Sequence, residues 1–444
     1  MKFTSPSEES AKISTEVVWG FWCGQIASRT NRWMRQMLQD TLLALACVFA
    51  CFASNLSAQQ PLDGAKPTQW RVIWTSDPAT TATVSWSTAK PSKKNVLHWG
   101  EKESELRQTS ANTRSGLHKD LRGSFELYFH HVRLRDLKPG TAYSVQMESD
   151  DGRSPEFYFV TAPAADRPFS LLFGGDSRSV QTNRQQVNRM IASMVADGET
   201  TGEVSQDILA LAHGGDYIAD GKNLAQWSEW LSDHELTVTP SGRLLPLIPA
   251  RGNHDVGPIF NEVFDFPEDD ANYYALAIGP QVRFVTLNSE TSIGGDQAKW
   301  LEDELKGSRD RYRWLVAQYH RPAWPAVKSP SEALRHWVPL FERYYVDLVC
   351  EADGHNIKRT PPIASDKVNQ AGVVYIGEGG LGVTQRTPKQ DRWFLQSPGM
   401  ADSGHHVQLL TFGQDELRYQ CVLLGGKVRD TYSRKPHTHP DRQP

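Results

Sequence analysis

The stretch "LLPLIPARGNHD", from Leu244 to Asp255, decides the fold. Its first half is a short apolar run, long enough for one buried strand, and a glycine marks where that strand ends. The amide, imidazole and carboxyl side chains of Asn253, His254 and Asp255 follow at once. Because α/β sheets carry their sites in loops at the carboxyl ends of strands, this stretch predicts an α/β domain with chemistry in such a loop.

Four further motifs place polar side chains directly after apolar runs of strand length. They are "GGDSR" with Asp176, "GGDYIAD" with Asp216, "QYH" with His320, and "ADGH" with Asp353 and His355. Stretches with apolar residues at three- and four-residue steps separate these runs, which predicts helices between the strands. A single motif of this kind is most often only a turn. All of them in one α/β pattern predict that their side chains meet in one site.

The part of the chain before this pattern, from Lys66 to Thr161, predicts an all-β sandwich. Alternating apolar runs such as "TATVSWST" and "EFYFVTA" are separated by Pro, Gly, Asp and Ser, as in sandwiches of about seven short strands. In "LKPGTAY", we expect the Tyr143 hydroxyl to bond back to the preceding loop, and the segment resembles the tyrosine corner of fibronectin type III domains. "TAPAADRP" is typical of a short, stiff linker. We therefore expect domains at residues 66–162 and 168–432.

Charge and cysteine content narrow the class of protein. The 444 residues have a formal net charge of −4 and no long basic run, which argues against nucleic acid or an anionic membrane surface as the main partner. A small soluble ligand is expected instead. Cys350 and Cys421 follow the N-terminal segment, and we interpret them as buried thiols on strands, with one bridge between them as the alternative. The tail, residues 433–444, is expected to be disordered, with His437 and His439 in solvent.

The N-terminus has the features of a targeting segment. The apolar run from Thr41 to Ala53 is too short to span a bilayer as a helix, and "SNLSAQQ" resembles a signal-peptidase site after Ala58. Because Met34 begins a short basic region, we expect residues 1–33 to be a leader upstream of the natural start and residues 34–58 to be a signal peptide. This predicts an exported protein, periplasmic or extracellular, without a stable membrane span. A residual anchor or an uncleaved segment is the alternative.

Taken in this order, the motifs resemble those of the calcineurin-like metallophosphoesterases, with "GNHD" as the most specific of them. Together with the preceding sandwich they resemble the purple acid phosphatases, over nearly all of the chain from Lys66 to Tyr432. The resemblance implies a fibronectin III-like domain followed by a four-layer α/β/β/α domain. It also implies two metal ions, Fe, Mn or Zn, which hold a phosphate oxygen and acidify a bound water.

The resemblance further implies which side chains bind the two ions. Asp216 would bridge both. Asp176 and His355 would serve the first ion, and Asn253 and His320 the second. Carboxylate and amide oxygens are hard donors and imidazole is a borderline one, which suits these metals.

Three further side chains have implied roles beside the ions. His254 would protonate the leaving oxygen or steady the transferring phosphoryl group, and Asp255 would orient it. Arg178 stands where many relatives have a histidine, so the first site lacks one protein ligand, which water or Asp220 would replace. The guanidinium of Arg178 is expected to contact the phosphate as a bidentate donor.

Two departures from the family pattern concern the metal ligands. The last family motif is Gly-His-x-His, and aligning "KRT" places His355 on its second histidine and Asp353 on its first. The alternative register leaves Ile357 where a ligand belongs. Purple acid phosphatases carry a tyrosine three residues after the bridging aspartate, where this chain has Ala219, and Tyr217 is expected on the wrong side of an extended segment.

The sequence thus predicts an exported phosphoesterase, most specifically a phosphomonoesterase acting on a small phosphate ester. A phosphodiesterase, including one directed at nucleotides, is the enzymatic alternative on the same residues. A surface protein that binds its ligand without turnover is the alternative from another class. The pattern of Asn253, His254 and Asp255 favours an enzyme, because a protein that only binds its ligand does not need all three side chains. Oligomeric state has no signal in the sequence.

Overall fold

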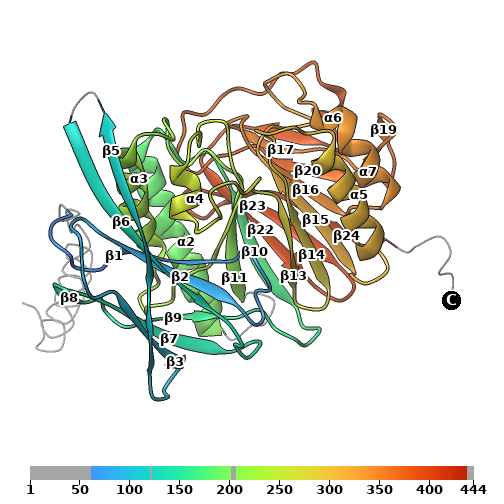
Figure 1. The fold of residues 1–444 in the computed structure, drawn as a ribbon. Helices are drawn as coiled ribbons and strands as arrows, with labels where there is room; N and C mark the ends of the chain where they lie inside the picture. The colour runs from blue at the N-terminus through green and yellow to red at the C-terminus, as the bar shows by residue number, and fades with distance from the viewer. Residues whose placement is uncertain (1–61, 121–122, 202–206, 438–444) are drawn as a thin grey trace, which may run out of the picture. The chain divides into compact units, whose positions relative to one another are not determined.

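Two β-sheets lie face to face in the computed structural model, and helices cover the outer side of each (Figure 1). The structure describes residues 62–437, apart from 121–122 and 202–206. The expected leader, the signal peptide and His439 lie outside these residues. Among the helices that are described, none is long and apolar enough to cross a membrane.

The first sheet has ten strands, and its middle is the parallel set β10, β11 and β12. β22 pairs antiparallel with β10 and begins the C-terminal edge of the sheet. In spatial order the strands are β24 (Val428–Arg434), β23 (Leu417–Leu423), β22 (His406–Phe412), β10 (Phe169–Gly174), β11 (Ile208–His213), β12 (Leu247–Pro249), β1 (Thr68–Ile73), β2 (Ala82–Thr88), β6 (Gly123–Leu134) and β5 (Asn112–Asp120).

The second sheet has seven strands, of which β14, β15, β16 and β20 run parallel. In spatial order they are β13 (Tyr274–Ile278), β14 (Val282–Thr286), β15 (Trp314–Tyr319), β16 (Leu348–Glu351), β20 (Val374–Gly377), β17 (Ile357–Arg359) and β21 (Met400–Asp402). A two-stranded ribbon joins β18 (Ile363–Ala364) to β19 (Lys367–Val368). Both main sheets are mixed, because each carries antiparallel strands at an edge.

The layers follow from the two-residue alternation of the strands. On β10, Leu171 packs between the sheets in the same hydrophobic core as Val316 of β15, whereas Leu172 packs against Val187 of a helix. On β15, Leu315 faces the other helical layer. The helices of the first layer are α2 (Gln181–Thr201), α3 (Leu224–His234) and α4 (Ile259–Val263), and those of the second are α5 (Asp296–Ser308), α6 (Ala333–His336) and α7 (Val338–Arg343).

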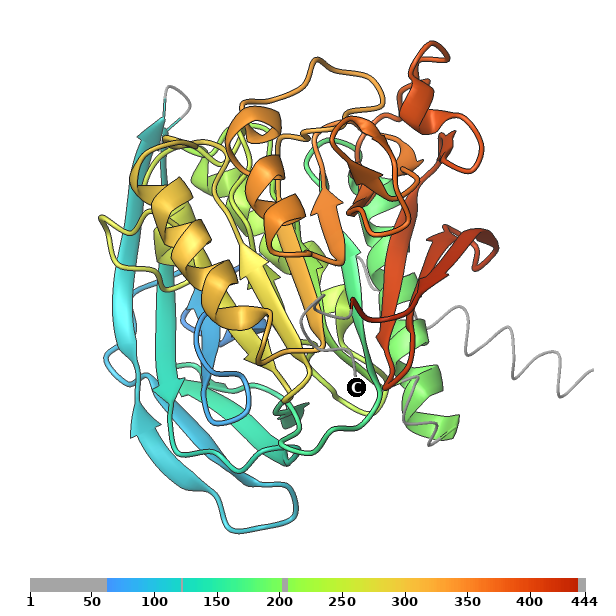
Figure 2. The same ribbon diagram turned by 90° about the vertical axis from the view of Figure 1, so that its right-hand side faces the viewer.

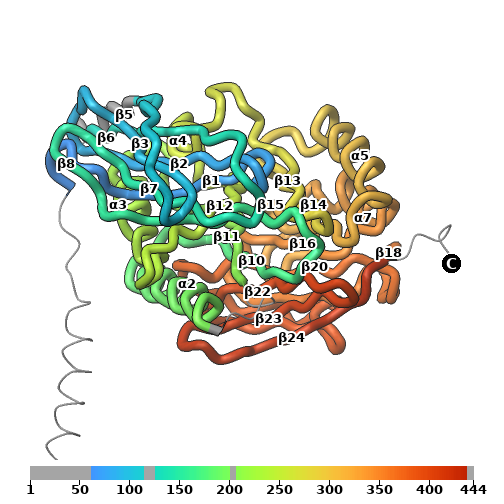
Figure 3. The backbone as a smooth tube through the Cα atoms, turned by 90° about the horizontal axis from the view of Figure 1, so that it is seen from below, coloured from blue at the N-terminus to red at the C-terminus, as the bar shows by residue number. Residues whose placement is uncertain are grey.

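The resulting order of layers is helix, sheet, sheet, helix, as predicted. Figure 2 shows the yellow and orange helices α5 to α7 in front of the second sheet. Figure 3 shows the strands of the two sheets as two rows, with α2 and α3 outside one row and α5 and α7 outside the other. Two short 3-10 turns, η2 (Glu235–Thr237) and η3 (Trp393–Leu395), complete the described helical segments.

The N-terminal strands divide between two sheets. Ile73 of β1 pairs in parallel with Leu247 of β12, so that β1, β2, β6 and β5 extend the first sheet. A separate five-stranded sheet contains β4 (Arg107–Ser110), β3 (Val96–Glu101), β7 (Ala142–Ser149), β8 (Gly152–Arg153) and β9 (Phe157–Val160). Nothing in the sequence pattern indicated the shared sheet. The boundaries at 162 and 168 and the fibronectin III-like detail stay predictions.

The tyrosine-corner prediction holds at the level of its hydrogen bond. The backbone N–H of Lys138 donates to the hydroxyl of Tyr143 over 2.7 Å. The stretch from Ser331 to Tyr345 has apolar residues at helical spacing, but it forms two short helices, α6 and α7, with a break at Trp337. Pro339 lies in the first turn of α7, where no intrahelical partner is needed for a backbone N–H. In the interior of one continuous helix, the missing N–H of Pro339 would interrupt the hydrogen bonds.

The cysteines and the C-terminal histidine can now be placed. Cys350 and Cys421 are buried free thiols on β16 and β23, as the favoured interpretation held, and the alternative bridge is not formed. The prediction that His437 sits in solvent is wrong. Its ring lies 5.7 Å from the Tyr345 ring and bonds the Arg434 guanidinium, because β24 runs on to Arg434 and carries the chain back onto the fold.

Candidate metal centre

The polar side chains singled out as metal ligands all lie in loops that follow the carboxyl ends of strands. They are Asp176 after β10, Asp216 after β11, Asn253 after β12, His320 after β15, and Asp353 and His355 after β16. Within each sheet these strands run parallel, so their carboxyl ends share one edge. The loops of the two sheets meet where the backbone N–H of Asp353 donates to Asp176 Oδ2 over 2.8 Å.

The loop backbone is held in an uncommon conformation at four of these residues. The φ angles are +57° at Asp176, +59° at Asp216, +67° at Asp353 and +59° at His355, in the left-handed region that side chains other than glycine seldom adopt. Such residues concentrate at functional sites. Gly379 makes room for the arrangement, because a Cβ at that position would lie 1.8 Å from Asp176 Oδ2.

Four donors converge on one point between the two sheets. Asp176, Asp216, His320 and Asp353 each offer one ligand atom, all of these atoms lie within 4.8 Å of one another, and all four residues are buried. Asn253 adds its amide oxygen, which lies 3.1 Å from His320 Nε2. This set of hard oxygen donors with one imidazole suits Mn, Fe or Zn.

The orientation of His320 shows that a cation belongs here. Its Nδ1 lies 2.9 Å from the carbonyl oxygen of Gly214, which can only accept, so Nδ1 carries the proton and Nε2 of the neutral ring carries the lone pair. That lone pair faces oxygens of Asn253 at 3.1 Å, Asp216 at 3.3 Å and Asp353 at 3.6 Å. Three hydrogen-bond acceptor oxygens therefore surround the lone pair of Nε2, which is itself an acceptor. Only a proton or a metal ion between them removes the repulsion.

The raised pKa of His320 has the same cause, which is the negative charge around its ring. Burial alone would lower that pKa, but the charge of Asp216 and the hydrogen bonds to Asp216 and Asp353 outweigh burial and raise the pKa well above its usual value. A metal ion would take the place of the proton that this environment attracts. The residues therefore fit a bound metal ion.

Arg178 lies on the other side of Asp216. Its Nε donates to Asp216 Oδ2 over 3.1 Å, its Nη1 donates to Ser179 Oγ over 2.8 Å, and its Nη2 lies 3.5 Å from His355 Nε2. His355 Nε2 is also 3.2 Å from Asp176 Oδ1, a buried oxygen that accepts no hydrogen bond from the described residues. The guanidinium thus contacts two of the three donors assigned to the first metal.

His254 lies at the rim of the centre, but Asp255 does not orient it as predicted. The His254 Nδ1 lies 2.7 Å from the carbonyl oxygen of Ala219, and this contact fixes the ring. The carboxylate of Asp255 is fully buried and accepts the backbone N–H groups of Asp216 and Gly252, each over 2.8 Å. Burial and the neighbouring Asp216 raise the pKa of Asp255 to about 8. Asp255 therefore holds the loop backbones together and does not touch His254.

Comparison with known proteins places these loops in a family. Residues 67–161 match the model of the purple acid phosphatase N-terminal domain, and residues 186–356 match the model of the calcineurin-like phosphoesterases. The chain carries a calcineurin-like phosphoesterase domain. The second match begins after Asp176 and includes the loops of Asp216, Asn253 and His320.

Relatives of the phosphoesterase domain agree with this assignment. An uncharacterised protein of Mycobacterium tuberculosis is 27% identical over 63% of this chain and 56% of its own length, so the chain spans little more than half of that relative. Acid phosphatase type 7 of Mus musculus is 24% identical over 76% of this chain and 82% of its own length. Purple acid phosphatase 13 of Arabidopsis thaliana is 25% identical over 61% of this chain and 57% of its own length.

Solved structures share the fold. Purple acid phosphatase PPD1 from yellow lupin superposes with a TM-score of 0.69 and 17% identity, over 83% of this chain and 74% of that one. A structure of PhoD superposes with a TM-score of 0.60 and 12% identity, over 85% of this chain and 92% of that one. The chain therefore has the purple acid phosphatase fold, with a β-rich N-terminal part and a mixed-sheet phosphoesterase domain.

Tyr217 in the phosphoesterase domain faces away from the centre, as expected. Its ring is fully buried and stacks on His213 at 3.9 Å between centroids, and it packs edge-on against Trp230 at 4.9 Å. Burial raises the pKa of the phenol well above 10. Ala219, at the position of the family tyrosine, is exposed and offers only its carbonyl to His254.

Two lysines that support the centre had no signal in the sequence. Lys328 Nζ bonds Asp353 Oδ1 directly. Behind the centre, Lys358 is fully buried and bonds the carboxylates of Glu351 and Glu378 and the carbonyl oxygen of Trp324. These partners tie the loop after β15 to the loops after β16 and β20. Lys358 is the first residue of the segment "KRT", which served only to align the last family motif. Lys328 lies in a proline-rich stretch that contains no motif.

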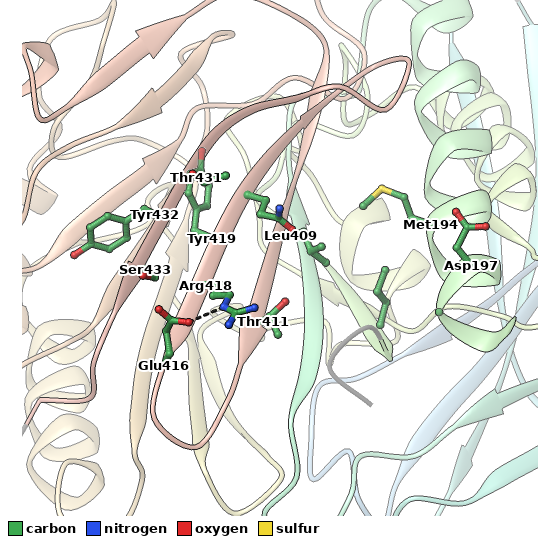
Figure 4. Close-up of a pocket in the computed structure, with 13 residues that line it drawn as sticks. Met194, Asp197, Leu409, Thr411, Glu416, Arg418, Tyr419, Thr431, Tyr432 and Ser433 are labelled. Atoms are coloured by element: carbon green, nitrogen blue, oxygen red, sulfur yellow. Dashed lines mark hydrogen bonds and ion pairs between the residues drawn. The ribbon is translucent and has the colours of Figure 1, made fainter. Parts of the chain in front are cut away.

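A cavity of about 770 Å³ lies apart from this centre. It is lined by one face of α2 and by β22, β23 and β24, including Met194, Leu409, Tyr419 and Tyr432, and the ion pair of Glu416 with Arg418 lies within it (Figure 4). It shares no lining residue with the metal centre. The candidate metal ligands therefore lie in the loops and not in this cavity.

Proposed function

We propose that the protein is an exported, metal-dependent phosphoesterase that hydrolyses phosphate monoesters. The observation that carries the proposal is the ring of oxygens from Asn253, Asp216 and Asp353 around the lone pair of His320 Nε2. The family match adds the reaction class, because it identifies the domain as a phosphoesterase. A bound metal ion would hold a phosphate oxygen and acidify a water molecule.

His254 is suited to transfer the proton that the leaving oxygen needs. Because its Nδ1–H donates to the Ala219 carbonyl oxygen, Nε2 is the ring atom left to hold or pass on a proton. Nε2 faces the centre, 3.9 Å from Asp216 Oδ2, and the ring is 33% exposed. The imidazole thus borders both the reacting phosphate and the solvent into which an alcohol departs.

The charges at the rim favour a monoester. Arg178 and Lys328 present two side-chain cations at the centre, one beside Asp216 and one beside Asp353. A phosphate monoester carries close to two negative charges at neutral pH, whereas a diester carries one. Two fixed cations therefore complement the monoester better, which supports it over the diesterase alternative.

Hydrolysis of p-nitrophenyl phosphate and of its bis-ester, each with Mn, Fe or Zn and each with a chelator, tests the proposal. We expect metal-dependent turnover of the monoester in excess of the bis-ester. The reverse preference would favour the phosphodiesterase. Phosphate binding without turnover of either ester would identify the non-catalytic binding protein.

Two variants separate metal binding from proton transfer. Asn253→Ala should lose bound metal, whereas His254→Ala should keep its metal and lose turnover by roughly two to four orders of magnitude. His336→Ala, at a half-buried histidine on α6, is the matched control and should retain both. Equal metal content and equal activity in the first two variants would contradict this division of roles.

Export is tested by N-terminal sequencing of the protein recovered outside the cytoplasm. We expect a start after Ala58, and deletion of residues 1–33 should leave secretion unchanged, because Met34 begins a complete signal sequence. A mature start upstream of Leu42 would contradict the cleavage.

A further inference from the structure

The guanidinium of Arg178 occupies the side of Asp216 on which the resemblance places the first metal. That metal would be bound by Asp176, Asp216 and His355. Arg178 Nε already donates to Asp216 Oδ2 over 3.1 Å, and Nη2 lies 3.5 Å from His355 Nε2. Two donor atoms that would face a metal ion therefore face N–H groups.

An arginine guanidinium keeps its positive charge in proteins. A metal ion could therefore bind at this position only if the whole guanidinium moved away. The side chain is held in place by Nη1, which donates to Ser179 Oγ over 2.8 Å, and it is only 16% exposed. Two cations within about 4 Å repel each other strongly at a site that is shielded from water.

The remaining donors are arranged for a single ion. The ligand atoms of Asp176, Asp216, His320 and Asp353 lie within 4.8 Å of one another, and Asn253 Oδ1 lies 3.1 Å from His320 Nε2. Asp176 Oδ1 is buried and accepts no hydrogen bond from the described residues. In the family assignment Asp176 serves the first ion, yet here it closes the ring of donors around the second.

We infer that this chain binds one metal ion where its relatives would bind two, and that the Arg178 guanidinium takes the place of the other ion. The inference rests on the proposed metal centre. The arginine has five N–H groups, of which three contact Asp216, Ser179 and His355 among the described residues. The other two N–H groups can donate to a phosphate oxygen. They would stabilise the negative charge of the phosphate, as the second metal ion would do.

Metal content decides the inference. The purified full-length protein is loaded with excess Mn²⁺, freed of unbound ion and measured for Mn per chain by elemental analysis, with electron paramagnetic resonance to distinguish isolated from coupled ions. We expect one Mn per chain and an uncoupled signal. Two Mn per chain with a coupled signal would overturn the inference and leave the proposed function standing. No bound Mn, Fe or Zn would instead overturn the proposed function.

Variants at Arg178 test the cause. Arg178→His removes the fixed charge and supplies an imidazole where many relatives have one, so it should bind a second Mn and show coupling. Arg178→Lys keeps a cation and should stay at one. Arg321→His is the matched control, because Arg321 follows His320 directly but pairs with Glu290 at 2.9 Å, and it should also stay at one. A single Mn in a folded Arg178→His protein would show that Arg178 does not exclude the second ion.

Discussion

Lys328 Nζ donates a hydrogen bond to Asp353 Oδ1, so the carboxylate that replaces a family histidine has a cation of its own. A carboxylate in place of an imidazole adds a negative charge to the ligand set, but the charge of Lys328 offsets that of Asp353. Burial opposes ionisation of Asp353, but the hydrogen bonds and charges of His320 and Lys328 outweigh it and lower the pKa.

Lys328→Met should tighten metal binding roughly tenfold, which corresponds to about 1.4 kcal/mol. The substitution frees a carboxylate oxygen for the metal and removes a nearby positive charge that repels it. Titration calorimetry with Mn²⁺ measures the change. Lys328→Arg keeps the charge and should leave the affinity nearly unchanged, and weaker binding by Lys328→Met would mean that the lysine supports the site by position and not by charge.

Asp353→Ala should weaken metal binding, because it removes one of the converging donors. If Lys328 acts through Asp353, the effect of Lys328→Met should shrink when Asp353 is already alanine. The four dissociation constants of this double-mutant cycle give the coupling between the two residues. Independent, additive effects would show that Lys328 does not act through Asp353, and unchanged metal affinity in Asp353→Ala would show that Asp353 is no ligand.

Iron-loaded protein should lack a strong visible band of the kind that a tyrosinate bound to ferric iron produces. Tyr217 packs on His213 in the core, its pKa is raised by burial, and Ala219 has no phenol to offer. The visible spectra of the iron-loaded wild type and of Tyr217→Phe should coincide. A band that disappears in Tyr217→Phe would place that tyrosine on the metal.

Lys358→Met should destabilise the fold by roughly 3–5 kcal/mol, because it leaves the buried carboxylates of Glu351 and Glu378 without their cation. Urea unfolding measures the loss. The triple variant with Glu351→Gln and Glu378→Gln removes all three charges and should recover most of the stability. Similar losses in the single and triple variants would indicate that lysine packing, and not charge, stabilises these loops.

Stability should fall as pH rises through neutrality because of Glu235. Burial raises the pKa of this carboxyl from 4.5 to about 7, although the hydrogen bond from the Gln69 backbone opposes the shift. The folded state binds the proton more tightly than the unfolded state, so this stabilisation is complete below pH 4.5 and is lost as pH rises through about 7. The loss amounts to about 3 kcal/mol.

Glu235→Gln should therefore be more stable than wild type at pH 8 by about that amount and nearly equal to it at pH 4.5. The amide keeps an oxygen to accept from Gln69 and cannot ionise. Thermal melts at the two pH values measure the difference, and Glu156→Gln at an exposed position is the control. A gain of equal size at both pH values would assign the effect to packing.

The α/β character of the domain and the loops that carry the candidate ligands could be predicted from the sequence pattern, and the order of the layers was implied by the family resemblance. An apolar run of strand length that ends in glycine and a polar residue predicts a strand followed by a loop. The α/β topology then brings such loops to one edge of the sheet. For this reason Asp176, Asp216, Asn253, His320, Asp353 and His355 could all be named before their distances were known. The hydrogen bond of Tyr143 to Lys138 was predictable for the same reason, since both partners lie in one short segment.

Only the tertiary structure decided how the charges around the centre are paired. Lys328 reaches Asp353, Arg178 reaches Asp216 and His355, and Lys358 reaches Glu378, over separations that no sequence pattern encodes. It also transferred the anchoring of His254 from Asp255 to the Ala219 carbonyl and joined β1 to β12. A strand end is set by its own residues, but an ion pair depends on which loops the folded sheets bring within a few ångströms of each other.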